Sequence, residues 1–387
     1  MDRTADPGLL PQGLRDILPP DAGFEAVVVE RLLSAFASRG YERVKPPLIE
    51  FEDGFLKSAS ADVARQTFRL MDPESRRMLA LRCDITPQVA RIAATRLKDA
   101  PRPLRLSYAG QVLQVSGSQL RPERQFGQAG IELIGAEAPA ADAEVVTLAV
   151  EALGELGLAD LAIDLNLPTL AATVAGGLGF EDAAVARLRS VLDRKDEAAV
   201  GPIAGSHAAV FVAMLRAFGP AEQALQHLRA IALPAPARSE LARLAEVVAL
   251  IRRRSPGLAL TVDPVEHRGF EYQSGISFVL FAPAARGELG RGGRYRTQAG
   301  ETATGFTLYT DTLLRALPRP QPFRRLLVDA QLPAAAASEL RRQGWVTVAA
   351  LSEGVDLMAE ARRLGCGHAW IGGVGRPVPE TPPKIER

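Results

Sequence analysis

Residues 110–135 read GQVLQVSGSQLRPERQFGQAGIELIG, which predicts two antiparallel strands joined by a loop with a charged tip at 121–124. On the return strand, Gln128 and Glu132 alternate with apolar residues and should share one face of a sheet. The incoming strand contains Gln114 and no cation. We therefore expect a sheet with one polar face, in which the return strand builds a wall of a site and the incoming strand supplies no positive charge.

The composition is that of an ordinary soluble protein: 387 residues, 47% hydrophobic and 24% charged, give room for two or three domains. Lysine and arginine number 46 against 45 acidic residues, so the chain lacks the basic excess of a nucleic-acid binder. The two cysteines and four histidines are scattered and predict neither a disulfide framework nor a metal site. Neither a signal peptide nor a run of about 18 apolar residues is apparent, which favours a cytoplasmic protein without a membrane span.

Apolar periodicity divides the chain into two parts. Residues 1–320 predict a core of helices and antiparallel strands, interrupted by an alanine- and leucine-rich helical insert at about 168–254. The segment LPRPQP, residues 317–322, predicts a linker. Residues 321–387 alternate as β-α-β-α-β, which favours a small parallel sheet, and end in a tail from Arg376 that we expect to be disordered.

Near the N-terminus, a helix is expected between residues 21 and 40, with an apolar stripe from Phe24 to Phe36. The segment YERVKPPLIEF, residues 41–51, predicts a strand broken by Pro46-Pro47, which should lie at a sheet edge or an interface because proline cannot donate to a ladder. We expect the stripe and this strand to form a twofold interface. Residues 66–82 predict a hairpin.

The order and spacing of these segments resemble the catalytic core of a class II aminoacyl-tRNA synthetase, most closely histidyl-tRNA synthetase, over residues 9–320. GLRDILPPD and the proline strand are similar to the first motif, which builds the homodimer interface of that family. LALRCDITPQVAR resembles its L-R-P-E-G-T segment, RQFGQAGIELIG its second motif, EHRGFEYQSG its histidine-specific R-G-L-D-Y-Y element and TATGFTLYTDTLL its third motif. The resemblance implies an α+β fold, an antiparallel sheet flanked by helices.

The departures from this family pattern fall where the synthetase holds ATP. Gln114 stands in place of an arginine that holds the α-phosphate, and Thr312 in place of the third-motif arginine that clamps the far phosphates. Tyr309 replaces a glycine. Losing one cation at such a site costs about 2.7–4 kcal/mol in the transition state. The resemblance therefore implies a chain without catalytic residues, unless Arg121 or Arg124 substitutes.

The amino-acid half of the resemblance is better retained. The residues matched to contacts with histidine are Asp84 at the α-ammonium group, followed by Thr86, then Gln128, Glu132, Tyr272 and Tyr295 on the imidazole side, and Arg268 at the carboxylate. Asp84 is one methylene shorter than the glutamate of the family, and Gln273 replaces the second of two tyrosines. The resemblance implies a pocket for L-histidine that needs neither metal nor cofactor.

This combination resembles the ATP phosphoribosyltransferase regulatory subunits, a non-catalytic family of paralogues of histidyl-tRNA synthetase. It implies a homodimer that joins a short-form ATP phosphoribosyltransferase catalytic subunit, the first enzyme of histidine biosynthesis, in a hetero-oligomer and supports its activity and histidine feedback. No tRNA binding is expected, since only about 67 residues (387 minus 320) follow the linker in place of an anticodon-binding domain.

Two other functions stay open at the level of sequence: an active histidine–tRNA ligase, and a histidine-binding subunit of another complex. Individual residues also have simpler explanations. Arg121 and Arg124 could solvate a hairpin tip, Glu132 could lie on an exposed sheet face, and Arg268 could form a surface pair with its neighbour.

Overall fold

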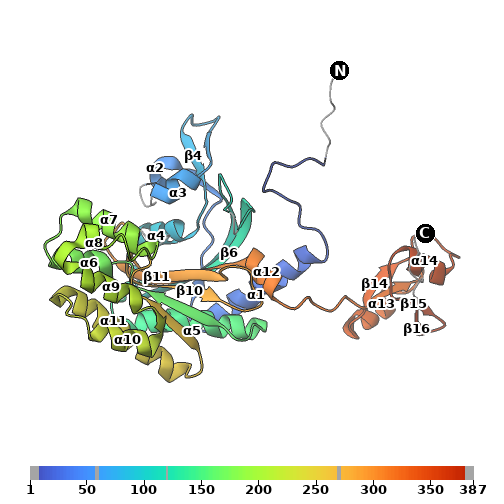
Figure 1. Cartoon of the computed structure of the whole chain (residues 1–387). Coiled ribbons are helices and arrows are strands. Elements are labelled where there is room, and N and C mark those ends of the chain that lie inside the picture. The colour runs from blue at the N-terminus through green and yellow to red at the C-terminus, as the bar shows by residue number, and fades with distance from the viewer. Residues whose placement is uncertain (1–7, 57–60, 119–120, 268–271, 380–387) are drawn as a thin grey trace, which may run out of the picture. The chain divides into compact units, whose positions relative to one another are not determined.

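The computed structural model describes residues 8–56, 61–118, 121–267 and 272–379. The chain divides into two compact units, Met1–Pro318 and Arg319–Arg387 (Figure 1). The division falls inside the proline-rich segment 317–322, where the sequence predicts a linker.

The first unit is built on a nine-stranded sheet. Neighbouring strands are antiparallel, except for the parallel pairs β1–β5 and β7–β9. Across the sheet the order is β1 (Glu42–Arg43), β5 (Leu104–Leu113), β6 (Gln125–Ile134), β12 (Thr302–Tyr309), β11 (Gly290–Arg296), β10 (Gln273–Phe281), β7 (Ala162–Asn166), β9 (Ala259–Asp263) and β8 (Gly219–Pro220). This order confirms the predicted antiparallel α+β architecture.

A smaller antiparallel sheet holds three strands in the order β2 (Ile49–Phe51), β4 (Met78–Leu81) and β3 (Arg69–Met71). Strands β3 and β4 are the predicted hairpin. Strand β2 follows Pro46-Pro47 and lies at the edge of this sheet, as the prolines predict.

Helices pack around the two sheets of the first unit (Figure 1). Outside the insert they are α1 (Asp21–Ala37), α2 (Glu52–Leu56), α3 (Ala61–Gln66), α4 (Thr86–Thr95), α5 (Pro139–Leu156) and α12 (Thr310–Ala316). The predicted helical insert contains α6 (Leu170–Gly177), α7 (Asp182–Asp193), α8 (Gly201–Ala204), the 3-10 turn η1 (Gly205–His207), α9 (Ala208–Arg216), α10 (Ala221–Arg229) and α11 (Ala235–Arg254). In the part of the chain that the structure describes, no helix is both long and apolar enough to cross a membrane.

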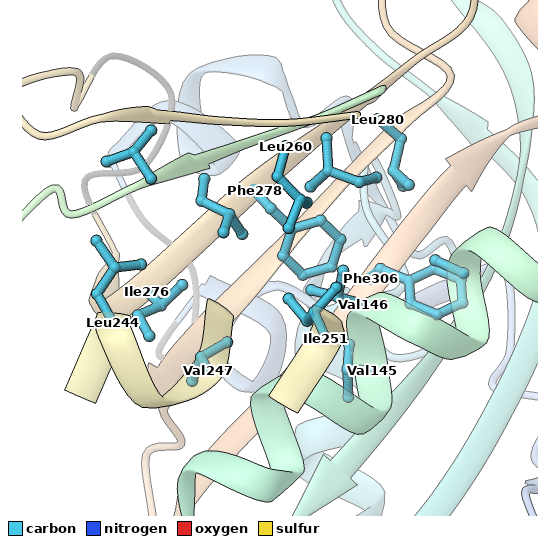
Figure 2. Packing of buried hydrophobic residues seen from close by; sticks show 14 of the residues in the cluster. Val145, Val146, Leu244, Val247, Ile251, Leu260, Ile276, Phe278, Leu280 and Phe306 are labelled. Atoms are coloured by element: carbon cyan, nitrogen blue, oxygen red, sulfur yellow. The ribbon is translucent and has the colours of Figure 1, made fainter. Parts of the chain in front are cut away.

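One face of the large sheet is buried against α1, α5 and α11. Figure 2 shows apolar side chains of the helices α5 and α11 packed against those of the strands β9, β10 and β12. The helices contribute Val145, Val146, Leu244, Val247 and Ile251, and the strands contribute Leu260, Ile276, Phe278, Leu280 and Phe306. Burial of each such side chain contributes roughly 1.5–3 kcal/mol relative to exposure. This layer fixes the strands whose opposite face carries the polar residues.

The apolar stripe of α1 belongs to the same core. Val28, Leu32 and Phe36 are at most 1% exposed, and the Phe36 ring meets Phe306 of β12 edge-on, with centroids 5.6 Å apart. The expectation that this stripe contributes to a twofold interface is therefore wrong. Its side chains are already covered by the sheet of their own chain.

The second unit contains β13 (Arg325–Val328), α13 (Ala334–Arg342), β14 (Val346–Ala349), α14 (Leu357–Arg363), β15 (His368–Ile371) and β16 (Val374–Pro377), in the sheet order β14-β13-β15-β16. Pairing of β13 with β14 and β15 is parallel, as the β-α-β-α-β pattern predicts.

The expected disorder of the tail from Arg376 is wrong for its first residues, because they belong to β16, which pairs antiparallel with β15. Gly372 and Gly373, both with positive φ (63° and 81°), make the tight two-residue turn that returns the chain. Residues 380–387 of the tail lie outside the described residues.

Candidate functional site

A pocket lies on the face of the large sheet that is opposite to α1 and α5. Strand β6 turns Ala129, Ile131 and Leu133 toward the helical core, so Gln128 and Glu132 face the other way, as the alternation predicts. The pocket lining comes from β6, β11, β12, the start of β10, α3 and the segment before α4.

Glycines make the floor of the pocket. A Cβ atom on Gly305 would lie 2.2 Å from Glu132 Oε2, and one on Gly293 (φ +150°) would lie 2.6 Å from Ser277 Cα. Side chains at these two positions would displace Glu132 or the neighbouring strand. The glycines therefore leave open the space between the polar side chains.

Asp84 and Thr86 stand at the start of α4. The Ile85 N–H between them donates to Gln128 Oε1 at 3.0 Å, and the Thr86 N–H donates to Asp84 Oδ1 at 3.4 Å. Burial raises the pKa of the Asp84 carboxyl, whereas the Thr86 N–H and the Gln128 side chain lower it. Gln128 thus ties Asp84 and α4 to the sheet, and both residues line the pocket.

Glu132 lies directly behind Tyr295. Its carboxyl is 1% exposed and accepts a hydrogen bond from the Tyr295 hydroxyl at 2.8 Å, so its proposed place on an exposed sheet face is wrong. Burial raises the pKa of Glu132 to about 8, and hydrogen bonds from Tyr295 and Thr86 oppose that rise. At neutral pH this carboxyl is mainly protonated and is able to donate a hydrogen bond as well as accept one.

Tyr272, Gln273 and Tyr295 close one side of the pocket. The Tyr272 and Tyr295 rings meet edge-on with centroids 6.1 Å apart, and Gln273 pairs with Tyr295 across β10 and β11. The Gln273 Oε1 atom is buried without a hydrogen-bond partner among the described residues. An unpaired buried acceptor is costly, so this oxygen is available to an N–H group of a ligand.

The charged tip of the hairpin is not a solvated loop. The Arg121 guanidinium lies 3.7 Å from the centroid of the Tyr309 ring and 3.5 Å from Asp311 Oδ2, and it also stacks near Phe126. Arg124 donates to the backbone oxygens of Gln12 and Gln114. The solvation explanation is wrong for both arginines, because aromatic rings, a carboxylate and backbone carbonyls bind them.

Of the two expected ATP-site positions, the structure brings only Gln114 to the pocket lining. Thr312 is buried on α12, where its hydroxyl accepts from Arg315 Nη2 at 3.3 Å. Arg268 lies outside the described residues. Arg291 of β11 lines the pocket, and the sequence analysis missed it. Arg291, Gly293 and Tyr295 stand at every second position of GRGGRY and so share one face of a strand, which was the signal that could have revealed Arg291.

The described residues hold no group of three or more histidine, cysteine or carboxylate side chains arranged for a metal ion. The arrangement instead combines a carboxylate, a protonated carboxyl with its tyrosine, amide groups and two arginines. Such a set suits a small zwitterion that has a polar side chain.

The fold and pocket together define a histidyl-tRNA synthetase-like protein. A sequence model of the family described as histidyl-tRNA synthetase matches residues 13–313. A crystal structure titled as an ATP phosphoribosyltransferase regulatory subunit/histidyl-tRNA synthetase from Bacillus halodurans superposes with a TM-score of 0.80, covering 92% of this chain and 96% of that one. At 24% identity this similarity establishes the fold alone.

Curated relatives narrow the assignment. The chain is 56% identical to the ATP phosphoribosyltransferase regulatory subunit of Rhodospirillum centenum over 97% of both chains. It is 55% identical to that of Paramagnetospirillum magneticum, over 95% of this chain and 97% of the relative. The chain therefore belongs to the family of ATP phosphoribosyltransferase regulatory subunits.

The raised pKa of Glu132 predicts a pH dependence of stability. Between pH 4.5 and about 8 the unfolded chain releases the Glu132 proton and the folded chain retains it, so the free energy of unfolding falls as pH rises through this window. The contribution is roughly 1.4 kcal/mol per pH unit. Glu132→Gln removes it. Urea unfolding at pH 5 and pH 8 should show a larger loss for the wild type than for the variant; parallel losses would contradict the assignment.

Proposed function

We propose that this chain is the regulatory subunit of an ATP phosphoribosyltransferase, the enzyme of the first step of L-histidine biosynthesis. It supports the activity of a short-form catalytic subunit and makes that activity sensitive to histidine. The observation that carries the proposal is the 56% identity to a regulatory subunit over 97% of both chains. We propose that the complex works in the cytoplasm, in keeping with its proposed role in biosynthesis.

We further propose that the pocket binds free L-histidine. Asp84 offers a carboxylate to the α-ammonium group, with Thr86 beside it. Glu132, presented through Tyr295, shares a proton with the imidazole, and Tyr272 flanks the ring of Tyr295. The sequence resemblance assigns the carboxylate to Arg268.

The chain itself is proposed to be non-catalytic and not to bind tRNA. The Tyr309 ring, with Arg121 stacked on it, lines the hairpin end of the pocket, where the resemblance places the nucleotide. In this chain, Gln114 and Thr312 stand where the synthetase has two phosphate-binding arginines. Arg121 is not a simple substitute for them, because its charge is already paired with Asp311. These contacts disfavour the ligase alternative.

We propose a homodimer as well. The three-stranded sheet exposes large apolar side chains that include Ile49, Phe51, Met71 and Met78. An exposed patch of this kind marks an interaction surface.

Histidine feedback should depend on Asp84. In a complex reconstituted with a short-form catalytic subunit, Asp84→Asn should move the histidine inhibition curve at least tenfold to higher concentration, because the ammonium group loses its charged partner. Activation without histidine should stay at the wild-type level. Asp99→Asn, the same change at an exposed site, is the matched control. Feedback also requires unequal binding of histidine to two states of the complex. An unchanged curve for Asp84→Asn would mean that histidine acts elsewhere.

ATP should bind weakly or not at all to the isolated chain, because Gln114 and Thr312 stand in place of the two phosphate-binding arginines and Arg121 already stacks on Tyr309 and pairs with Asp311. Calorimetry with ATP and Mg²⁺ measures this directly. Micromolar affinity, or histidine-dependent exchange of pyrophosphate into ATP, would instead favour the ligase.

Light scattering should give the mass of a dimer for the isolated chain. Phe51→Asp should yield monomers, because a charge would be buried at the interface. Phe218→Asp is the control, since Phe218 is also exposed but belongs to the helical insert. A dimer that survives Phe51→Asp would exclude the three-stranded sheet as the interface.

A further inference from the structure

Arg291 occupies a central position on the polar face of the sheet. It lies in one row with Thr307 of β12 and Gly130 of β6, and Gly130 offers no side chain above the sheet. Along β11, Arg291 and Tyr295 share the pocket face and are separated by Gly293. A ligand on the glycine floor therefore has the Glu132–Tyr295 pair at one end and Arg291 at the other.

The guanidinium of Arg291 is held in place by Glu288. Arg291 Nη2 lies 2.8 Å from Glu288 Oε1 and 2.7 Å from Oε2, and Arg291 Nε lies 3.1 Å from Oε2. This pair engages the Nε–Nη2 edge and fixes the plane of the group. Burial lowers the pKa of Arg291, but Tyr309 and Glu288 raise it above its usual value, so the charge is retained.

The charge of Arg291 influences the Asp84 carboxyl. Burial is the main effect on the Asp84 carboxyl and raises its pKa, while the charge of Arg291 lowers it. The pocket lining thus combines the Asp84 carboxyl group with the Arg291 guanidinium, whose charge favours the ionised form of that carboxyl. An α-ammonium and an α-carboxylate on one carbon atom carry the complementary pair of charges.

The other described arginine of the pocket is less suited to this role. The Arg121 guanidinium stacks on Tyr309 and lies beside Asp311 at the hairpin end. An arginine that binds the ligand must also stand beside it, and Arg291 lies on the same face of β11 as Tyr295, whereas Arg121 belongs to the hairpin. Arg291 projects from a central strand of the sheet, so its backbone is rigidly placed.

From this arrangement we infer that Arg291 binds the α-carboxylate of the amino-acid ligand and makes the pocket selective for intact α-amino acids. The inference rests on the proposal that the pocket binds free histidine. It assigns the carboxylate to a residue of β11 and not to Arg268, the residue that the sequence resemblance indicates.

Calorimetry with L-histidine and L-histidinol tests the inference, because histidinol keeps the ammonium and imidazole groups but has an alcohol in place of the carboxylate. The wild-type chain should bind histidine roughly 10- to 100-fold more tightly than histidinol. Arg291→Ala should remove most of this preference by weakening histidine alone, and histidinol affinity should change less than about threefold. Arg291→Lys, which keeps the charge but not the fork, should lose part of the preference.

Arg121→Ala and Arg268→Ala are the matched arginine controls, and both should keep the preference for histidine over histidinol. Thermal unfolding verifies that each variant is folded. If Arg291→Ala does not fold, the comparison is made with Arg291→Lys instead. Equal weakening of both compounds by the Arg291 variants would reduce Arg291 to a structural role and overturn the inference. Loss of the preference in Arg268→Ala or Arg121→Ala, but not in Arg291→Ala, would overturn it too. A wild-type chain that binds neither compound would overturn the histidine proposal itself, a result distinct from these.

Discussion

The buried hydrogen bond between Tyr295 and Glu132 is the contact on which the site depends. It joins β11 to β6 across the intervening strand β12, and it is possible only because glycine at position 305 leaves room for the Glu132 carboxyl. The helical core on the far face fixes the register of all three strands. Burial of this carboxyl raises its pKa to about 8, so the fold itself sets the protonation state of the pocket.

The two ends of the pocket differ in how far their polar groups are already paired within the protein. At the end near β11, glycines leave space between charged groups and an amide oxygen that has no hydrogen-bond partner among the described residues. At the hairpin end, the Tyr309 ring, Phe126 and Arg121 satisfy one another, and Asp311 pairs with the arginine. If the pocket binds histidine as proposed, a synthetase-like scaffold has kept its amino-acid site while the region beside it became packed structure.

Much of this was predictable from local patterns. Period-two alternation placed Gln128 and Glu132 on one face, and the prolines at 46 and 47 placed β2 at an edge. The predictions that failed were those that depend on tertiary contacts. The stripe of α1 has the same pattern whether it meets a partner or its own sheet, and only the packing of Phe36 on Phe306 decides. The alternation in GRGGRY indicates that Arg291 shares a face with Tyr295, but the register of β11 with β12 and β6, which places this face over Gly130, is not visible in a single sequence.

The most direct test of the account is calorimetry of L-histidine binding to the isolated chain as a function of pH. The complex is expected to hold one proton between Glu132 and the imidazole. Glu132 supplies that proton below pH about 8, and free imidazole stays neutral above about pH 6.5. Affinity should therefore be highest between these values and fall on both sides, and Glu132→Gln should abolish the decline between pH 7 and pH 8.5. Absence of histidine binding, or an affinity that does not change across this range in the wild type, would contradict the account.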